Sequence, residues 1–373
     1  MRFETFEMER MQSTWENRVR YNLSESGVKP INLGELVDPL TLKDTALGYP
    51  QSNGSIELRE LISDLYPGSD AENVVVTNGT AEANFVSVLN LVEPGDHVVV
   101  MLPNYMQIWG LARSLGANVE PLWLREETKW APDLDELARV VTDKTKLIAI
   151  CNPNNPTGAV LGEDDMREIC KIGGKVGAWI LSDEVYQGAE HGEEPSPTLW
   201  GWYDRLLVTC GLSKAYGLPG LRIGWVVGPP DKVEDLWSYK DYTSIGPGAL
   251  SDTLARVALE PTRRHQILER TRSILKKQFP VLEKWVSEQN GLFTMVPPQA
   301  AAIAYLRYDL EIGSGELITR AREEKSVLLV PGDQLNMDRY IRVGFGYDVE
   351  ILEKGLELFS ELLETVRSEV AHS

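Results

Sequence analysis

The sequence predicts an α/β fold: a large domain with a mostly parallel sheet covered on both faces, and a smaller α+β domain. From about residue 72 to residue 228, short apolar runs rich in β-branched residues alternate with amphipathic helical stretches. After residue 262 the pattern changes to one long helical stretch, followed by short strands and helices. Continuous apolar strands separated by helices are typical of parallel sheets that are buried on both faces.

The elements of the large domain alternate along the chain. Helical patterns at 80–92 and 163–177 lie between the apolar runs, and glycine and proline mark strand exits at 93–96, 152–158 and 228–230. The predicted strands are NVVVTN (73–78), DHVVVML (96–102), KLIAICN (146–152), AWILSDE (178–184), RLLVTCG (205–211) and RIGWVVG (222–228).

The second region begins with a helical pattern at 262–289, in which Pro280 is a candidate break. Three further strands and a terminal helix are predicted, namely AIAYLRY (302–308), KSVLLVPG (325–332), YIRVGFG (340–346) and the helix at 349–366. We expect the N-terminal 45 residues to pack onto this region. The predicted division is therefore residues 46–262 for the large domain, and residues 1–45 with 263–373 for the small domain.

The composition excludes several classes of protein. A formal net charge of −19 argues against nucleic acid or an anionic membrane as a partner, because both need clustered Lys and Arg. Three widely spaced cysteines fit a reducing compartment, and four scattered histidines give little support to a metal site. The N-terminus lacks the pattern of a secretory or transit peptide and no apolar run reaches membrane-spanning length, so we expect a cytoplasmic protein.

The stretch GLSKAYGLPGLRIGW, residues 211–225, places Lys214 and Arg222 on either side of a stiff turn. Polar residues also end the neighbouring predicted strands, among them Asp183, Asn155 and Thr80. In open α/β sheets, ligands bind outside the carboxyl ends of the strands. The pattern therefore predicts a ligand site at this edge of the sheet.

The segment NGTAEA, residues 78–83, follows a strand and opens a helix. Gly79 permits a tight turn, and the free N–H groups of residues 79–81 can hold an anion, although an ordinary threonine N-cap is the alternative interpretation. Arg222 supplies a charged partner for the same anion. A phosphate beside the reactive Lys214 predicts a phosphorylated aldehyde cofactor held as a Schiff base.

Five motifs together resemble the aminotransferase class I/II family, whose members are fold-type I pyridoxal 5′-phosphate (PLP) enzymes. In the order of the family they are GYPQSNGSIELREL, NPNNPTG, SDEVY, GLSKAYGLPGLRIGW and YIRVGFG. The resemblance covers nearly the whole chain. It implies a mostly parallel seven-stranded sheet in the large domain, a smaller α+β domain, and PLP as the cofactor.

The resemblance implies a role for each residue near the cofactor ring. Lys214 bonds to the cofactor and moves the α-proton of the substrate, and Asp183 binds the pyridine nitrogen. Tyr186 and Asn155 donate hydrogen bonds to the phenolic oxygen, and Tyr105 stacks on the ring. From the residues alone, Asp183 can also be a structural carboxylate and Tyr105 a core aromatic residue.

The resemblance also implies how the phosphate and the substrate are held. Arg342 grips the α-carboxylate of the substrate, with Asn155 beside it, and Gly34 lies close to the substrate. Tyr49 reaches the phosphate of a neighbouring subunit, which makes the protein a homodimer with shared active sites. The phosphate contacts within the chain are Gly79, Thr80, Ala81, Ser213 and Arg222.

The sequence departs from the family pattern in three places. Position 211 is glycine where the family usually has Ser or Thr, whose hydroxyl helps to hold the phosphate. Ala300 and Ala301 replace a common Gly-Gly pair, and Leu335 replaces a common Phe. Because the last two departures lie in regions that shape the substrate pocket, the identity of the substrate stays open.

The leading hypothesis for the reaction is transamination between an α-amino acid and a 2-oxo acid. The alternative is elimination and cyclisation of a hydroxylated arginine-like amino acid, because LSESGVKPINLGEL resembles the capreomycidine synthase-like cyclases of the family. A cationic substrate needs carboxylates, which Glu9, Glu35 and Asp38 could supply. A dicarboxylate needs a second cation, for which Lys240 is the candidate. A regulatory, non-catalytic member of the fold is disfavoured by the acidic charge.

Overall fold

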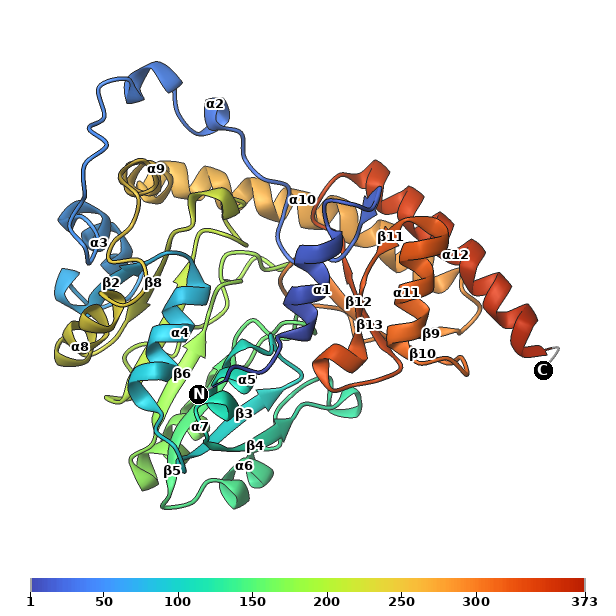
Figure 1. The fold of residues 1–373 in the computed structure, drawn as a ribbon, viewed down its shortest axis with the longest axis horizontal. Coiled ribbons are helices and arrows are strands. Elements are labelled where there is room, and N and C mark those ends of the chain that lie inside the picture. The colour runs from blue at the N-terminus through green and yellow to red at the C-terminus, as the bar shows by residue number, and fades with distance from the viewer. Residues whose placement is uncertain (1, 372–373) are drawn as a thin grey trace.

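A seven-stranded sheet lies at the centre of the larger part of the molecule (Figure 1). The computed structural model describes residues 2–371. The sheet has the order β2-β8-β7-β6-β5-β3-β4, and β8 is antiparallel to both of its neighbours while the other pairs are parallel. The predicted fold class is therefore confirmed. The strands are β2 (Val74–Thr77), β3 (His97–Leu102), β4 (Asn118–Trp123), β5 (Thr145–Cys151), β6 (Trp179–Asp183), β7 (Leu206–Gly211) and β8 (Gly224–Val227).

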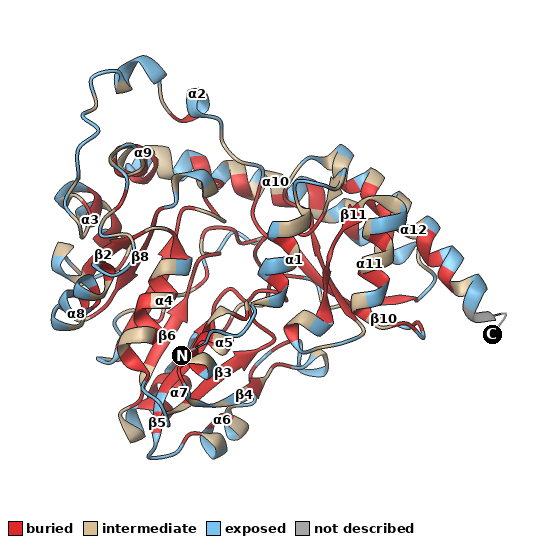
Figure 2. Cartoon of the chain, viewed as in Figure 1, coloured by how far each residue is buried: buried red, intermediate tan, exposed pale blue. Residues whose placement is uncertain are grey.

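Burial explains why these apolar runs form strands. Every residue of β2, β7 and β8 is buried, as the red strands of Figure 2 show, so these strands are covered on both faces. Loss of apolar surface to water is the main force that holds such a layer together. The helices of this part are α3 (Ile56–Ser63), α4 (Thr80–Leu91), α5 (Gln107–Ser114), α6 (Leu134–Val140), α7 (Glu163–Val176), α8 (Pro230–Lys240) and α9 (Ala249–Leu259).

Strand β4 was not among the predicted strands. It lies at the edge of the sheet, where it pairs only with β3, and several of its residues are exposed. It also contains Pro121, which an edge strand tolerates because one row of its N–H groups needs no partner. An edge strand therefore lacks the continuous apolar run by which the buried strands were found.

The smaller part contains a four-stranded antiparallel sheet of order β12-β13-β10-β9. Its strands are β9 (Phe293–Met295), β10 (Ile303–Tyr308), β12 (Val330–Pro331) and β13 (Tyr340–Gly344). A separate parallel pair joins β1 (Tyr21–Asn22) to β11 (Val327–Leu328). The helices here are α10 (Pro261–Ser287), α11 (Ser314–Lys325) and α12 (Val349–Ala371).

Two details of this part differ from the predictions. Helix α10 continues through Pro280 without a break, because Leu275, Leu282 and Trp285 on either side of it are buried and hold both halves. Tertiary packing of this kind outweighs one missing backbone hydrogen bond. The predicted strand at 325–332 divides into β11 and β12, which pair with different partners.

The N-terminal segment contacts both parts of the molecule. Helix α1 (Glu7–Trp15) and β1 lie at the smaller part, where β1 pairs with β11. Residues before α1 reach the larger part, where the ring of Phe3 lies 6.2 Å from that of Phe85. The segment is thus a bridge, and the exact division at residues 45/46 and 262/263 stays a prediction.

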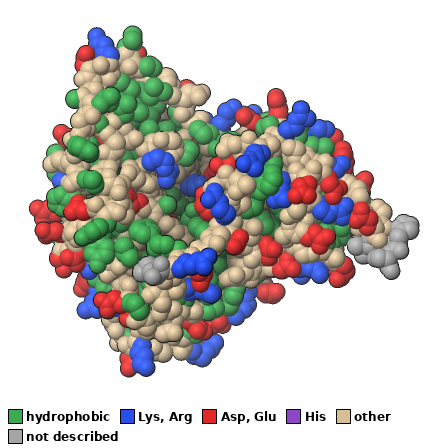
Figure 3. Space-filling view, in the orientation of Figure 1, with side chains coloured by type: hydrophobic (Ala, Val, Ile, Leu, Met, Phe, Trp, Pro, Cys, Tyr) green, Lys and Arg blue, Asp and Glu red, His purple; other side chains and the backbone are tan. Residues whose placement is uncertain are grey.

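Residues 33–50 form an arm that projects from the top of the molecule (Figure 1). The arm includes the short helix α2 (Leu33–Leu36) and carries exposed apolar side chains, with Leu40 73%, Leu47 79% and Tyr49 93% exposed. Figure 3 shows hydrophobic side chains gathered on this projection, whereas basic and acidic side chains are intermingled over the rest of the face. Within residues 2–371, no helix is long and apolar enough to cross a membrane.

Candidate active site

A cavity of about 280 Å³ lies between the two parts of the molecule, and we name it the Lys214 pocket. Its walls come from α1, from the segment after β1, from the start of α4 and from the loops after β5, β6 and β7. The candidate carboxylate Glu9 lines it, and so do ten of the predicted cofactor and substrate residues, namely Thr80, Ala81, Tyr105, Asn155, Asp183, Tyr186, Ser213, Lys214, Arg222 and Arg342. Residues more than 260 positions apart therefore converge on one cavity.

The first turn of α4 forms one end of the pocket. Gly79 caps the helix with a φ of 79°, a conformation that favours glycine, and a side chain there would collide with the guanidinium of Arg222. Arg222 Nη1 donates to Ser213 Oγ at 3.4 Å. The hydroxyl oxygen of Thr80 is buried without a hydrogen-bond partner. A helix N-terminus, a guanidinium and two hydroxyls thus face one space, which is a suitable site for a phosphate.

Steric crowding explains why position 211 is a glycine. A Cβ added to Gly211 would lie 2.6 Å from Thr80 Oγ1 and 2.9 Å from the carbonyl oxygen of Ile223. A serine therefore does not fit there unless its neighbours move. The hydroxyl of Thr80 lies in the space that a larger side chain at 211 would enter.

Asp183 ends β6 and is held by an amide that the sequence analysis missed. Asn84 Nδ2 donates to Asp183 Oδ2 at 2.8 Å, and Thr209 Oγ1 donates to Asn84 Oδ1 at 2.7 Å, which fixes the orientation of the amide. Burial raises the pKa of the Asp183 carboxyl to about 6 against the opposing effect of Asn84. The only signal in the sequence was that Asn84 follows Thr80 by one helical turn.

Arg342, Asn155 and Tyr186 form a connected buried network. Arg342 Nη1 donates to Asn155 Oδ1 at 2.9 Å, and Asn155 Nδ2 donates to the Tyr186 hydroxyl at 3.0 Å. The Tyr186 hydroxyl in turn donates to Ser26 Oγ at 2.9 Å. Arg342 Nη2 donates to the carbonyl oxygen of Ser24 at 2.6 Å, but its Nε is buried without an acceptor. Arg342 also lines the Lys214 pocket.

Lys214 makes an ion pair that the sequence analysis did not anticipate. Its Nζ lies 2.8 Å from Glu25 Oε1, and both side chains are about three-quarters buried. The adjacent ammonium lowers the pKa of Glu25 to about 2. Burial lowers the pKa of Lys214, but the charge of Glu25, the Tyr186 hydroxyl and the hydrogen bond to Glu25 together outweigh it, so this pKa is raised.

Helix α1 forms the remaining wall. Its residues Met8, Glu9 and Gln12 line the pocket, as does Glu16 one turn further on. Tyr105 lies opposite, and its hydroxyl donates to Glu9 Oε2 at 2.9 Å.

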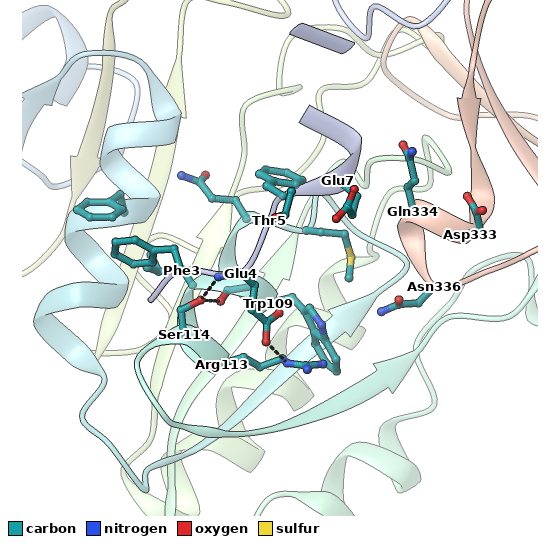
Figure 4. A pocket seen from close by; sticks show the side chains of 16 residues that line it. Phe3, Glu4, Thr5, Glu7, Trp109, Arg113, Ser114, Asp333, Gln334 and Asn336 are labelled. Atoms are coloured by element: carbon teal, nitrogen blue, oxygen red, sulfur yellow. Dashed lines mark hydrogen bonds and ion pairs between the residues drawn. The ribbon is translucent and has the colours of Figure 1, made fainter. Parts of the chain in front are cut away.

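A second cavity of about 340 Å³ is lined by residues 3–7, by residues of α5 and by Asp333, Gln334 and Asn336 (Figure 4). The ion pair of Arg113 with Glu4, 2.9 Å long, and the hydrogen bond from the Glu4 N–H to Ser114 Oγ form part of its wall. None of the site residues predicted from the sequence lines it. The chemistry is therefore concentrated in the Lys214 pocket.

Comparison with known proteins agrees with this geometry. A family model described as aminotransferase class I and II matches residues 19–359. The chain belongs to this family. The family and the fold imply PLP as the cofactor, and the unpartnered hydroxyl of Thr80 beside Arg222 fits its phosphate.

Individual relatives of this family differ in activity. A capreomycidine synthase of Streptomyces vinaceus is 33% identical over 93% of this chain and 91% of its own length. A solved PLP-dependent aminotransferase from Streptococcus suis 89-1591 is 35% identical, with a TM-score of 0.92 over 98% of this chain and 99% of that chain. A solved PLP-dependent cyclase, OrfR, is 25% identical, with a TM-score of 0.87 over 99% and 98% of the two chains.

The structure places Gly34 away from the Lys214 pocket of its own chain. This residue lies on α2 in the arm, with open space around it, and does not line the pocket. Glu25 and Ser26 line the pocket instead, because the pairing of β1 with β11 carries this segment past Arg342. The sequence contains two similar motifs, NLSESG (22–27) and NLGEL (32–36), and it is the earlier one that contributes residues to the pocket. Tyr49 lies on the arm as well, and its contact with a neighbouring subunit stays a prediction.

Three charged candidates also lie outside the pocket. Glu35 and Asp38 cap short helices, where their carboxylates accept from the Asn32 and Leu40 N–H groups. Lys240 is fully buried, and its Nζ donates to the carbonyl oxygens of Ser52 and Val76. The charged groups of Glu35, Asp38 and Lys240 thus already form hydrogen bonds with the backbone. Glu16 and Glu25, which the sequence analysis did not single out, line the pocket instead.

We predict that Lys214→Ala prevents covalent attachment of PLP. Borohydride reduction of the holoenzyme followed by peptide mass mapping should locate the cofactor on Lys214, and turnover of the variant should fall at least about a hundredfold because its proton carrier is lost. Lys175→Ala, at an exposed position on α7, is the control and should keep the label. Labelling of another lysine in wild-type protein would contradict the assignment.

We predict that Asp183→Asn stabilises the cofactor-free chain near neutral pH and weakens PLP binding. Because the folded-state pKa is raised from 3.8 to about 6, the folded state binds the proton more tightly, and stability falls as pH rises through this range. The variant has no carboxyl at this position and so does not lose stability as the pH rises. Its free energy of unfolding should exceed that of wild type by up to about 3 kcal/mol at about pH 7.5 and should match it at about pH 3.5. Asp204→Asn, at an exposed site, should show no such difference.

Proposed function

We propose that this family member acts on an α-amino acid whose side chain ends in a cation. The observation that carries the proposal is the charge of the Lys214 pocket. Glu9, Glu16 and Glu25 line the side formed by α1 and the segment after β1. The cations among the described lining residues are Lys214, Arg222 and Arg342.

Each of these three cations has another task in the proposed site. Lys214 carries the cofactor, Arg222 faces the space for its phosphate, and Arg342 takes the α-carboxylate of the substrate. No lining cation is then left for a second substrate carboxylate within the described part of the chain. A dicarboxylic substrate would bring its negative charge toward the acidic wall, which is unfavourable.

Within the acidic wall, Glu25 is paired with Lys214, whereas Glu9 and Glu16 form no ion pair with another described residue. The pKa of Glu16 is raised by burial and by the charges of Glu25 and Glu9. Mutual repulsion of this kind is relieved when a guanidinium or an ammonium enters between the carboxylates. A bound cationic side chain would therefore be attracted by the wall and orient the substrate relative to Lys214.

The other residues of the pocket have roles that follow from their contacts. Arg342, which lines the pocket, would bind and orient the α-carboxylate. Asp183 holds positive charge at the ring nitrogen of the cofactor, with Asn84 fixing its carboxylate. PLP, when bound, accepts the electron pair that the breaking Cα–H bond leaves. Lys214 takes the proton from Cα and returns a proton later in the reaction.

For the reaction we propose transamination with a 2-oxo acid. The second candidate is elimination and cyclisation. The residues that would bind the cofactor serve both reactions equally. Transamination is supported by the aminotransferase relatives, including the Streptococcus suis structure. Cyclisation of an arginine-like substrate is supported by the 33% identity with capreomycidine synthase and by the acidic wall, which suits a guanidinium.

A single-turnover experiment tests the substrate class and the reaction together. The holoenzyme is mixed with a panel of cationic, neutral and dicarboxylic amino acids, including hydroxyarginines, without any 2-oxo acid. We expect the cationic members to react, with release of one 2-oxo acid per active site. A cyclised product that keeps its α-amino group would establish the second candidate, and a preference for aspartate or glutamate would overturn the proposed substrate class.

The Glu16→Gln variant is the matched test of the acidic wall. It removes one charge without changing the shape of the side chain, so KM for the preferred cationic substrate should rise roughly tenfold, with little change for a neutral amino acid. Glu7→Gln, on the same helix but outside the Lys214 pocket, should leave both KM values unchanged.

We also propose that the enzyme is a homodimer joined through the arm, with Tyr49 completing the phosphate site of the neighbouring subunit. The exposed side chains of Leu40, Leu47 and Tyr49 support this proposal, because a projecting apolar segment is costly to leave in water. The arm also connects directly to α3 and β2 of the large sheet, close in sequence to the phosphate loop.

Sedimentation equilibrium tests the dimer against the chain mass of 41.7 kDa. The wild-type protein should have twice this mass. Leu47→Asp should shift the protein toward the monomer, whereas Tyr49→Phe should keep the dimer and weaken PLP binding roughly tenfold, the cost of one hydrogen bond to a charged group. Tyr21→Phe is the control for loss of a hydroxyl away from the arm. A wild-type monomer with full PLP affinity would refute the shared site.

A further inference from the structure

Glu25 is held firmly against Lys214 by its own backbone surroundings. Its Oε1 accepts the Nζ–H of Lys214 at 2.8 Å, the N–H of Ser26 at 2.9 Å and the N–H of Gly27 at 3.0 Å. The pairing of β1 with β11 fixes the chain just before this turn. The carboxylate therefore cannot turn away from Lys214 without losing two backbone hydrogen bonds.

Other titratable groups face the pair from every neighbouring element, but their contacts are different. They are Glu9 of α1 and Glu16 after it, Asp183 and Tyr186 at the end of β6, Arg342 of β13, and Tyr347 after β13. Arg342 is bonded to Asn155 and Ser24, and Asp183 to Asn84. Among the described carboxylates, Glu25 is the one that forms an ion pair with Lys214.

We propose that Glu25 is a positioning residue that aims Lys214 Nζ into the pocket and stabilises the ammonium that Lys214 becomes when it accepts the substrate proton. The inference rests on the proposed role of Lys214. In this step the Cα–H bond breaks, the proton bonds to the lone pair of Nζ, and the electron pair of the broken bond would be taken up by the cofactor of the proposed function. No reactant beyond substrate and cofactor is required.

The physical basis is the same as for any base supported by a carboxylate. A negative charge beside a base favours its charged form and fixes its orientation, so proton uptake is easier and the proton is retained until it is needed. Burial alone would disfavour an ammonium in this pocket. The raised pKa of Lys214 agrees with the pair that the geometry shows.

The test is the reactivity of Lys214 toward acetic anhydride in full-length protein from which PLP has been removed. Only the neutral amine reacts, so the rate, measured by mass spectrometry of the Lys214 peptide between about pH 7 and about pH 11, reports the pKa of that amine. In Glu25→Gln, which keeps the shape and removes the charge, we expect a lower midpoint and at least about tenfold faster acetylation near pH 8.

The Glu16→Gln variant is the control, because it removes a charge from the same pocket without touching Lys214. We expect less than about a threefold change in that variant, and partial retention of the wild-type midpoint in Glu25→Asp. Circular dichroism establishes that each variant is folded. An unchanged midpoint in Glu25→Gln, or equal shifts in Glu25→Gln and Glu16→Gln, would overturn the role of Glu25.

The same proteins separate this inference from the proposed function. If borohydride reduction places PLP on a lysine other than Lys214, the proposed site fails whatever the acetylation rates are. If PLP is on Lys214 but the Glu25→Gln midpoint is unchanged, the site stands and the role of Glu25 fails.

Discussion

The buried guanidinium of Arg342 needs hydrogen-bond acceptors. The acceptors that it contacts join the smaller part of the molecule to the larger part and to the N-terminal segment. Arg342 is 1% exposed and projects from β13 of the smaller sheet. Its acceptors are Asn155, after β5 of the large sheet, and the backbone of Ser24 in the N-terminal segment. A buried cation without such partners would cost several kcal/mol, so these three segments must meet where the pocket lies. The pocket therefore forms where the guanidinium finds its partners.

Two carboxylates in this pocket are shifted in opposite directions by their surroundings. Asp183 has a raised pKa because burial dominates its environment, whereas Glu25 has a lowered one because an ammonium lies against it. Such a divergence assigns different tasks to similar groups. Glu25 has its partner in Lys214, whereas under the proposed function Asp183 would gain one from the ring nitrogen of the cofactor. The proposed function thus assigns one end of the site to the cofactor and the other to proton transfer.

The residues that match the family and the carboxylates of the acidic wall lie on different sides of the same pocket. The loops after the strands of the large sheet carry the residues expected to hold PLP, and they match a family that contains both aminotransferases and a cyclase. Helix α1 and the segment after β1 carry the carboxylates and come from the N-terminal segment. Chemistry and selectivity are separated in this way in many folds, because one scaffold can present different walls to the same reactive centre.

The sequence by itself determined the buried strands of the large sheet, because these form local patterns. Motif order predicted the phosphate turn at Gly79 and the roles of Lys214, Asp183 and Arg342, and the structure places these three side chains around one pocket. The sequence did not reveal the edge strand β4, the support of Asp183 by Asn84 or the pair of Glu25 with Lys214. It named Gly34 as a residue close to the substrate and did not single out Glu25 and Ser26, which line the pocket. Only the tertiary structure decided these points, since strand pairing between residues about 300 positions apart brings these two residues to the site. Contacts of this kind leave no periodic signal in the chain, because a periodic pattern depends only on residues that are close in the sequence.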